Sequence, residues 1–281
     1  MSGNIDKKVV EGFGHEWSTF DQHDTLEQQR QIFEQYFSLF PFAEIGADAV
    51  GFDLGCGSGR WAYFVSEHVA NLHLIDPSPA ALEVARKNLM VRQNCEFHQA
   101  SVDAIPLKDS SMDFGYSLGV LHHVPNTQQG IASCVSKLKV GAPFLLYLYY
   151  AFDNRPLWFK ALWRVSDLGR RVISVLPQRP KLMVSQLIAA FIYWPLARFA
   201  LIAERLGVNV EHLPLAAYRD ETFYVMRTDA LDRFGTRLER RFTRLAVQQM
   251  MEEAGLERIR FRDGTPYWCA LGFRRPDVSG K

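Results

Sequence analysis

Three glycines stand at alternate positions directly after a short apolar run and an acidic residue. The segment from Val50 to Trp61 reads V-G-F-D-L-G-C-G-S-G-R-W, so that Asp53 is followed by Gly55, Gly57 and Gly59. An apolar run, a glycine turn and a helical pattern in this order are typical of the nucleotide cleft of an open α/β sheet. Glycine permits positive φ and lets a ligand approach the backbone closely. We therefore expect a nucleotide-containing ligand at this turn.

The residues around the glycines narrow the choice of ligand. A dinucleotide site would have its third glycine one residue later, where Arg60 stands. The carboxylate of Asp53 would repel a pyrophosphate, whereas it suits a ligand with a positively charged centre. A second acid, Asp76, ends the apolar run 71–75, roughly twenty residues after the turn, where a carboxylate can accept both ribose hydroxyls.

Two motifs carry a resemblance to a known family. D-x-G-x-G-x-G resembles motif I of class I S-adenosylmethionine (SAM)-dependent methyltransferases, and SAM has the sulfonium and ammonium groups that Asp53 would favour. The run I-P-L-K-D-S-S-M-D-F-G-Y-S-L-G-V-L-H-H-V-P resembles the methyltransferase type 11 group, the small-molecule enzymes of the ubiquinone and menaquinone kind. The resemblance covers residues 48–150 well and 225–275 loosely. It implies SAM as the cofactor, held by Asp53, Gly55, Cys56, Gly57, Gly59, Asp76, Val102, Asp103 and Leu118.

The fold expected from this resemblance and from the apolar runs is α/β. We predict a Rossmann-like, doubly wound, seven-stranded and mostly parallel sheet with an antiparallel last strand, plus an N-terminal helical cap and a helical insert after strand five. The fully apolar run 144–150 fits a fifth strand buried on both faces. The predicted parts are a cap at 1–47, a SAM-binding core at 48–154, a helical insert at 155–225, the C-terminal part of the core at 226–275 and a tail at 276–281.

Candidate residues for the acceptor side follow strands four and five. Methyl transfer from SAM is an in-line displacement, so much of the catalysis can be alignment of the nucleophile. A general base is needed only when the nucleophile carries a proton of high pKa, and histidine can serve near neutral pH. His123 is the candidate base, and a structural role for the L-H-H segment is the alternative. His122, Tyr149, Tyr150 and the aromatic Trp17 are candidates for substrate binding, with core packing as the alternative for Trp17.

The insert combines basic and aromatic residues. Residues 1–150 hold 10 basic and 17 acidic side chains, whereas 151–281 hold 22 and 14. Seven bases lie in 155–181 against Asp167 alone, interleaved with Trp158, Trp163 and other large side chains. Such a segment is typical of a solvated helical face, a membrane-surface helix, a nucleic-acid patch or a site for an acidic substrate. Gln186, Pro195 and Arg198 argue against a membrane span over 183–203, and Pro195 should break or kink that helix, leaving two shorter pieces.

These observations favour a cytoplasmic SAM-dependent methyltransferase that acts at oxygen or carbon of a small apolar or aromatic acceptor, with peripheral membrane association through the insert as an alternative location. The insert would be a lid, a substrate tunnel or a homodimer interface. The four cysteines are dispersed and do not have the spacing of metal ligands, which argues against disulfides and against a bound metal. Nucleic acid is disfavoured because no Asn/Asp-Pro-Pro-Tyr motif follows strand four. The alternatives are an RNA or protein methyltransferase that uses the basic half, a non-catalytic SAM-binding protein, and an enzyme in which SAM assists a cyclisation or decarboxylation.

Overall fold

The computed structural model describes residues 3–7, 9–11, 26–210, 213–264 and 266–276. It divides into a core unit, residues 1–151 and 238–281, and a helical unit, Phe152–Arg237. The helical unit extends beyond the predicted insert, which ends at residue 225. Its last helix, α10 (Phe223–Gly235), packs against the other helices of this unit, which explains why the boundary lies further along the chain than the sequence suggested.

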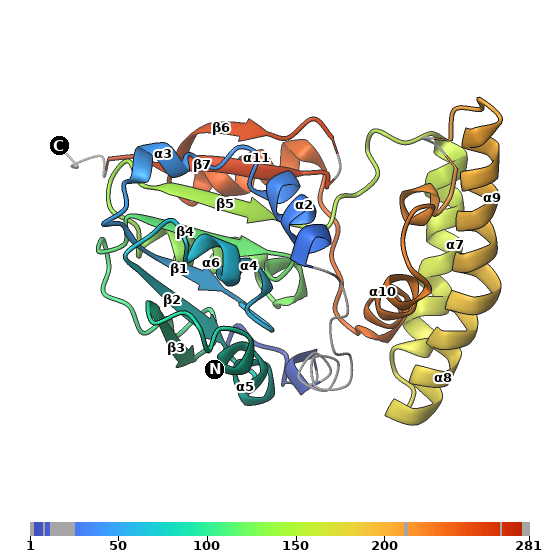
Figure 1. Cartoon of the computed structure of the whole chain (residues 1–281), viewed down its shortest axis with the longest axis horizontal. Helices are drawn as coiled ribbons and strands as arrows, with labels where there is room; N and C mark the ends of the chain where they lie inside the picture. Colours follow the sequence, from blue (N-terminus) through green and yellow to red (C-terminus); the bar gives the residue numbers. More distant parts are fainter. Residues whose placement is uncertain (1–2, 8, 12–25, 211–212, 265, 277–281) are drawn as a thin grey trace. The chain divides into compact units, whose positions relative to one another are not determined.

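The core unit contains a seven-stranded sheet of order β3-β2-β1-β4-β5-β7-β6 (Figure 1). Strands β1 to β5 pair in parallel, and β7 pairs antiparallel with both β5 and β6. The predicted fold is therefore confirmed, including a final strand inserted into the sheet. The strands are β1 Val50–Leu54, β2 Asn71–Asp76, β3 Cys95–Gln99, β4 Phe114–Leu118, β5 Pro143–Tyr147, β6 Leu256–Phe261 and β7 Cys269–Arg274. The run 97–102, whose composition predicts the third strand, begins two residues after the observed start of β3.

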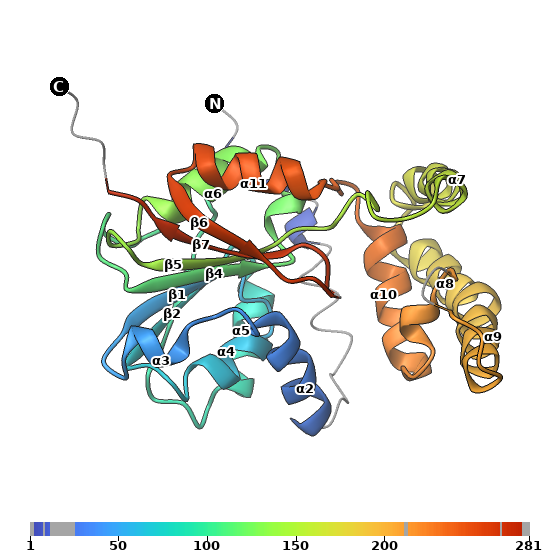
Figure 2. The same ribbon diagram turned by 90° about the horizontal axis from the view of Figure 1, so that it is seen from above.

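Helices cover both faces of this sheet (Figure 2). One face carries α2, α3, α4 and α5, and the other carries α6 and α11, with a separate apolar cluster on each side. Side-chain caps start several of these helices: Ser78 accepts from the Ala81 amide before α5, and Thr243 from the Ala246 amide before α11. The helices are α2 Leu26–Tyr36, α3 Phe42–Ile45, α4 Arg60–Val65, α5 Pro79–Asn88, α6 Thr127–Val135 and α11 Arg244–Glu253, with a 3₁₀ turn at Leu121–His123.

The order of the strands fixes where a ligand can bind. The chain passes from β1 to β2 and β3 on one side, and then crosses back to β4 on the other side of β1. In such sheets ligands bind beyond the carboxyl ends of the strands at this switch point. The glycine turn follows β1 directly, so the sequence motif and the topology indicate the same place.

The helical unit consists of α7 (Leu157–Ile173), α8 (Gln178–Ile188), α9 (Trp194–Arg205) and α10, with a 3₁₀ turn at Ala216–Tyr218. Of the break or kink predicted at Pro195, the break is wrong. A π-helical turn, Ala189–Tyr193, joins α8 to α9, and the Trp194 amide bonds to the Ala189 carbonyl five residues back. The wider turn before Pro195 lets the helix continue from Gln178 to Arg205. By length and apolar composition alone this 28-residue helix could cross a membrane, and 28% of its most apolar window is buried.

Candidate active site

The glycine turn after β1 adopts the strained backbone that its composition predicts. Gly55, Gly57 and Gly59 have φ of 77°, 53° and 76°, values that side-chain-bearing residues seldom adopt. A Cβ on Gly55 would collide with Val120, and one on Gly59 would lie 2.8 Å from Leu89. The turn therefore has no room for side chains at these two positions, and Gly55 and Gly57 line the cavity described below.

Asp76, at the end of β2, is tied to the turn. Its two carboxylate oxygens accept the amides of Gly57 (3.0 Å) and Ser78 (2.8 Å). Burial raises the pKa of Asp76, and these two amides lower it in part. Each oxygen retains a further lone pair. The carboxylate is thus oriented by the protein and can still accept hydroxyl groups of a ribose.

Asp53, in β1, is a buried carboxyl group without a cation. It is 2% exposed, and among the described residues its Oδ2 has no hydrogen-bond partner. Burial raises the pKa of Asp53 from 3.8 to about 8, with the nearby Tyr116 hydroxyl lowering it and Asp76 raising it further. The pKa of the neighbouring Cys56 thiol is also raised by burial. A buried acid of this kind is satisfied when a positive group joins it, as the ammonium of SAM would do.

A cavity of about 160 Å³ lies at the carboxyl edge of the sheet. The predicted site residues that line it are Gly55, Gly57, Asp76, Val102, Leu118 and His123. Others do not line it: Asp53, Cys56, Gly59, Asp103, His122, Tyr149 and Tyr150. Trp17 lies outside the described residues. The lining also includes residues that sequence reasoning missed, namely Asn4, Ile5, Asp6, Val9, Val10, Leu54, Ser78, Gly119, Val120 and Val124.

The N-terminal residues reach the cavity through Asn4. Its side chain exchanges two hydrogen bonds with the backbone of Asn126, at 2.8 and 2.7 Å, and its amide donates to Asp103 Oδ2 at 3.1 Å. Asp103, expected at the adenine, also accepts from Ser101. A pairing between residues 122 positions apart leaves no local pattern in the sequence, so the sequence could not have revealed this contact.

The two adjacent histidines have different environments. His123 Nδ1 lies 2.7 Å from the carbonyl oxygen of Leu238. Because a carbonyl only accepts, Nδ1 carries the proton and Nε2 is the basic nitrogen of the neutral ring. His122 is fully buried, stacks on Tyr149 at 3.8 Å, and has no hydrogen-bond partner for either ring nitrogen among the described residues. Burial lowers the pKa of His122 well below its usual value. Among the described residues, His123 therefore has a hydrogen-bonded ring at the cavity, whereas His122 has a buried ring that stacks on Tyr149.

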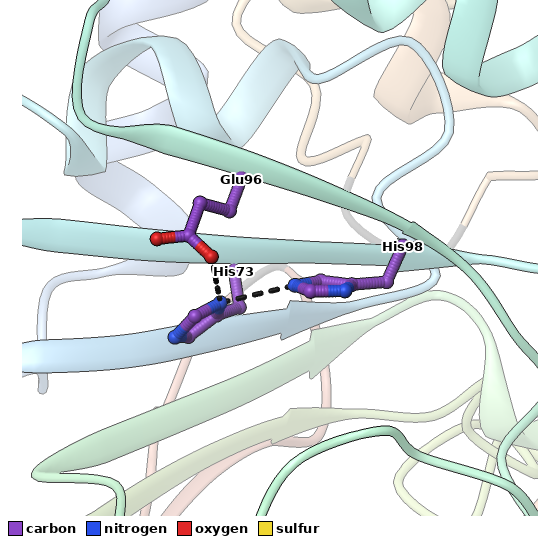
Figure 3. A group of neighbouring side chains, drawn as sticks. All are labelled: His73, Glu96 and His98. Atoms are coloured by element: carbon purple, nitrogen blue, oxygen red, sulfur yellow. Dashed lines mark hydrogen bonds and ion pairs between the residues drawn. The ribbon is translucent and has the colours of Figure 1, made fainter.

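A second cluster of polar side chains lies outside the cleft, on β2 and β3 (Figure 3). His73 Nδ1 is 3.0 Å from His98 Nε2 and 3.4 Å from Glu96 Oε2. Such nitrogen and oxygen atoms can bind a metal ion, but a hydrogen bond between one protonated and one unprotonated ring nitrogen explains the short contact equally well. Burial, more than the charge of His98, lowers the pKa of His73. None of the three residues lines the cavity, so the cluster takes no part in this site.

The fold and the cleft together define a Rossmann-like nucleotide-binding domain of the α/β class. Residues 52–146 match the family model described as "Methyltransferase domain". Ubiquinone biosynthesis O-methyltransferase of Coxiella burnetii is 25% identical over 127 residues, which are 45% of this chain and 52% of that protein. The same enzyme of Aromatoleum aromaticum is 25% identical over 187 residues, 63% of this chain and 75% of that protein.

Solved structures share the fold. A Haloferax volcanii methyltransferase in complex with its activator Trm112 has a TM-score of 0.53 at 12% identity, covering 94% of this chain and 98% of that one. An O-methyltransferase family protein of Burkholderia thailandensis has a TM-score of 0.52 at 15% identity, covering 88% and 56%. The chain spans about half the length of the first curated relatives it matches.

The chain contains a class I SAM-dependent methyltransferase domain that resembles the ubiquinone O-methyltransferases. Its cofactor is SAM, as the motifs predicted. The described residues fit this cofactor, since an Asp53 oxygen without a hydrogen-bond partner among them can accept a cation, and Gly55, Gly57 and Asp76 line the cavity.

Proposed function

We propose that the chain transfers a methyl group from SAM to an oxygen or carbon atom of a small apolar or aromatic acceptor. The observation that carries the proposal is the cavity, where Asp76 and the glycine turn lie in the same lining as His123 and several aliphatic side chains. A cofactor site and an acceptor site that share one cavity allow direct transfer between the two molecules. The curated relatives are O-methyltransferases by name, which favours oxygen.

The cofactor residues have separate tasks in this proposal. Asp53 balances the ammonium of SAM, Asp76 accepts the ribose hydroxyls, and the amides and small side chains of Gly55, Cys56, Gly57 and Gly59 allow close approach. Val102, Asp103 and Leu118 surround the adenine end. Because Asp103 Oδ2 already accepts from Asn4, the N-terminal segment shares this part of the site.

His123 acts as the general base when the acceptor is a hydroxyl. SAM supplies a methyl group that its sulfonium already activates for displacement. As the acceptor oxygen forms its bond to the methyl carbon, His123 Nε2 takes the hydroxyl proton, and the Leu238 carbonyl steadies the resulting imidazolium through Nδ1. A positioned base of this kind contributes typically 10²–10⁴-fold to the rate.

The decisive experiment measures S-adenosylhomocysteine formation with a panel of phenols and catechols, with and without an alkyl tail. We expect turnover of at least one acceptor, and we expect His123→Gln to lower kcat at pH 7 by roughly 10²-fold or more while the Kd for SAM is unchanged. His68→Gln, which alters an exposed histidine, serves as the control. Turnover unaffected by His123→Gln would exclude the base, and SAM binding without turnover of any small acceptor would favour a non-catalytic role.

The alternative acceptor is RNA or protein, bound by the basic half of the chain. Its supporting observation is the charge pattern of residues 155–181. Nucleic-acid binding through Lys and Arg releases counterions, so the affinity would fall steeply with salt. Tight RNA binding at physiological salt would support this alternative, and weak non-specific binding would support the small acceptor.

The helical unit sets acceptor choice in this proposal. The Ala151 amide bonds to the Phe242 carbonyl, and a β-bridge joins Tyr150 to Phe242. The chain therefore leaves and re-enters the core unit at neighbouring points, and a short glycine linker can replace residues 152–237. We expect the shortened chain to bind SAM and to lose acceptor turnover. Full retained turnover would exclude a lid, and loss of SAM binding would indicate a structural role.

A further inference from the structure

Helix α7 exposes a stripe of apolar side chains and buries two of its charged side chains. Leu157, Val165 and Leu168 are 83%, 66% and 63% exposed, whereas Asp167 and Arg170 are buried at 8% and 6%. A surface helix of a soluble domain normally has the reverse arrangement, with its apolar stripe against the core. The orientation of α7 therefore needs an explanation.

Polar contacts within the helical unit hold α7 in this orientation. Arg170 donates from Nε to Asp167 Oδ1 at 2.6 Å and from Nη1 to the Thr236 carbonyl at 2.9 Å. Arg233 of α10 donates to Ser166 Oγ at 2.8 Å. Because a buried ion pair is costly to break, these contacts fix which face of α7 points away from α10.

The outward stripe has the spacing of one helix face. Leu157, Ala161, Val165, Leu168 and Val172 follow one another at intervals of three or four residues, and such residues are neighbours on a helix surface. Trp158 and Leu162, also exposed, broaden the stripe on one side.

Basic residues border the other side of the stripe. Lys160, Arg164 and Arg171 again have spacings that place them along one edge of the helix. The single acid of α7, Asp167, is turned inward and paired with Arg170 and Arg171. An apolar stripe beside an edge that carries more basic than acidic side chains is the pattern of helices that lie in a membrane interface.

The rest of the helical unit continues this apolar surface. Of the 23 large apolar residues exposed in the described parts of the chain, 18 belong to this unit, and the other five are dispersed over the core unit. On the joined helix α8–α9 they include Phe191 at 75% and Phe199 at 60% exposure. Scattered exposed apolar residues are normal, but a concentration of this size marks an interaction surface.

We propose that α7 docks the helical unit on an anionic phospholipid bilayer, lying in the interface with its apolar stripe in the acyl region and its basic edge at the headgroups. The charge pattern of α7 favours a lipid bilayer over a second copy of the chain as the partner of this surface. Juxtaposed copies of α7 in a symmetric dimer would bring Lys160, Arg164 and Arg171 toward like charges, whereas anionic headgroups complement them. The 17 residues of α7 span about 25 Å, less than the roughly 30 Å of a bilayer core, so α7 lies along the surface.

The proposed membrane contact does not depend on which acceptor the enzyme methylates. It would nevertheless place the enzyme where strongly apolar acceptors partition, and its loss should leave SAM binding by the core unit intact. Lipid binding and cofactor binding can therefore be measured separately on the same full-length chain.

The test is co-sedimentation of the full chain with phosphatidylcholine vesicles, with and without phosphatidylglycerol. We expect binding to the anionic vesicles that weakens as NaCl is raised. Val165→Glu with Leu168→Glu should lower the vesicle partition coefficient at least tenfold. The matched control is Val140→Glu, at an exposed valine of the core unit, which should bind as the wild type does. Lys160→Ala with Arg164→Ala should abolish the preference for anionic vesicles. Circular dichroism and SAM titration confirm that each variant is folded.

Three results would overturn the proposal. Equal losses for the Val165/Leu168 pair and for Val140→Glu would show that α7 is not the docking face. A dimer in light scattering that the Val165/Leu168 pair makes monomeric, without vesicle binding by the wild type, would assign the face to a second copy. Protein that leaves the vesicles only in detergent, and not in alkaline carbonate, would assign membrane contact to a span through Gln178–Arg205.

Discussion

Asp53→Asn should stabilise the cofactor-free protein and do so more strongly as the pH rises. The folded-state pKa of Asp53 is about 8, against 3.8 for an ordinary aspartate. A carboxyl group whose folded pKa is raised supports folding fully below pH 3.8, and that support is lost as the pH rises through 3.8 toward 8. At physiological pH the folded protein therefore holds Asp53 mainly protonated, whereas the unfolded chain has released that proton, and this difference destabilises the empty fold.

The magnitude follows from the two pKa values. By linkage, release of this proton in the unfolded chain lowers the free energy of unfolding by about 2 kcal/mol at pH 5 and about 4 kcal/mol at pH 7. The asparagine amide carries a pH-independent cost of its own, roughly 1–3 kcal/mol for a buried group with an unmade hydrogen bond. The gain from Asp53→Asn should therefore grow by about 2.5 kcal/mol between pH 5 and pH 7, whatever the cost of the amide.

The assay is urea unfolding of the wild type, Asp53→Asn and the exposed-site control Asp48→Asn at pH 5, 6 and 7. We expect the Asp53 variant to gain stability relative to the wild type with rising pH and the control to show no such trend. Added SAM should reverse the order, because the wild type gains stability by mass action and the variant lacks the carboxylate for the ammonium. A stability difference that is flat with pH would refute the reasoning.

Two further substitutions test the surroundings of the cavity. Asn4→Ala removes the two side-chain hydrogen bonds to Asn126. It should raise the SAM dissociation rate constant, measured by stopped flow, by on the order of tenfold. An unchanged rate constant would show that the N-terminal segment does not close the site. His122→Phe replaces a buried ring whose nitrogens have no hydrogen-bond partner among the described residues, and it keeps the stack on Tyr149. Thermal unfolding should therefore show unchanged or higher stability, and kcat should be retained. A large loss of kcat would give His122 a role in catalysis.

The sequence was most informative where a local pattern carries a physical requirement. The alternation of Gly55, Gly57 and Gly59 after an apolar run requires a strand that turns sharply into a helix, and this is what β1 and α4 form. Ser78 before Pro79 and Thr243 before α11 are helix caps because their hydroxyls accept amides three residues on. Such features depend on neighbours along the chain, and the sequence alone predicts them.

Contacts between distant residues could not be predicted in this way. Asn4 pairs with Asn126, and His123 bonds to the carbonyl of Leu238. The sequence contains each residue but no signal of the pairing. The tautomer of His123, on which its role as a base depends, follows from the second of these contacts. The order of α8, a π turn and α9 was missed for a different reason, because the proline rule assumes regular α-helical geometry before the proline.

For the basic and aromatic residues of the insert, the structure distinguishes between interpretations that the sequence left open. Composition alone allowed a solvated face, a membrane surface or a nucleic-acid patch. If α7 were an ordinary surface helix, its leucines and valines would be the buried residues, and Asp167 and Arg170 would face water. The structure has the opposite arrangement, and the buried pair of Asp167 and Arg170 keeps it so. A nucleic-acid patch would need exposed bases but no apolar stripe, whereas a membrane interface needs both, side by side on one helix. The orientation of α7 therefore favours the membrane over nucleic acid.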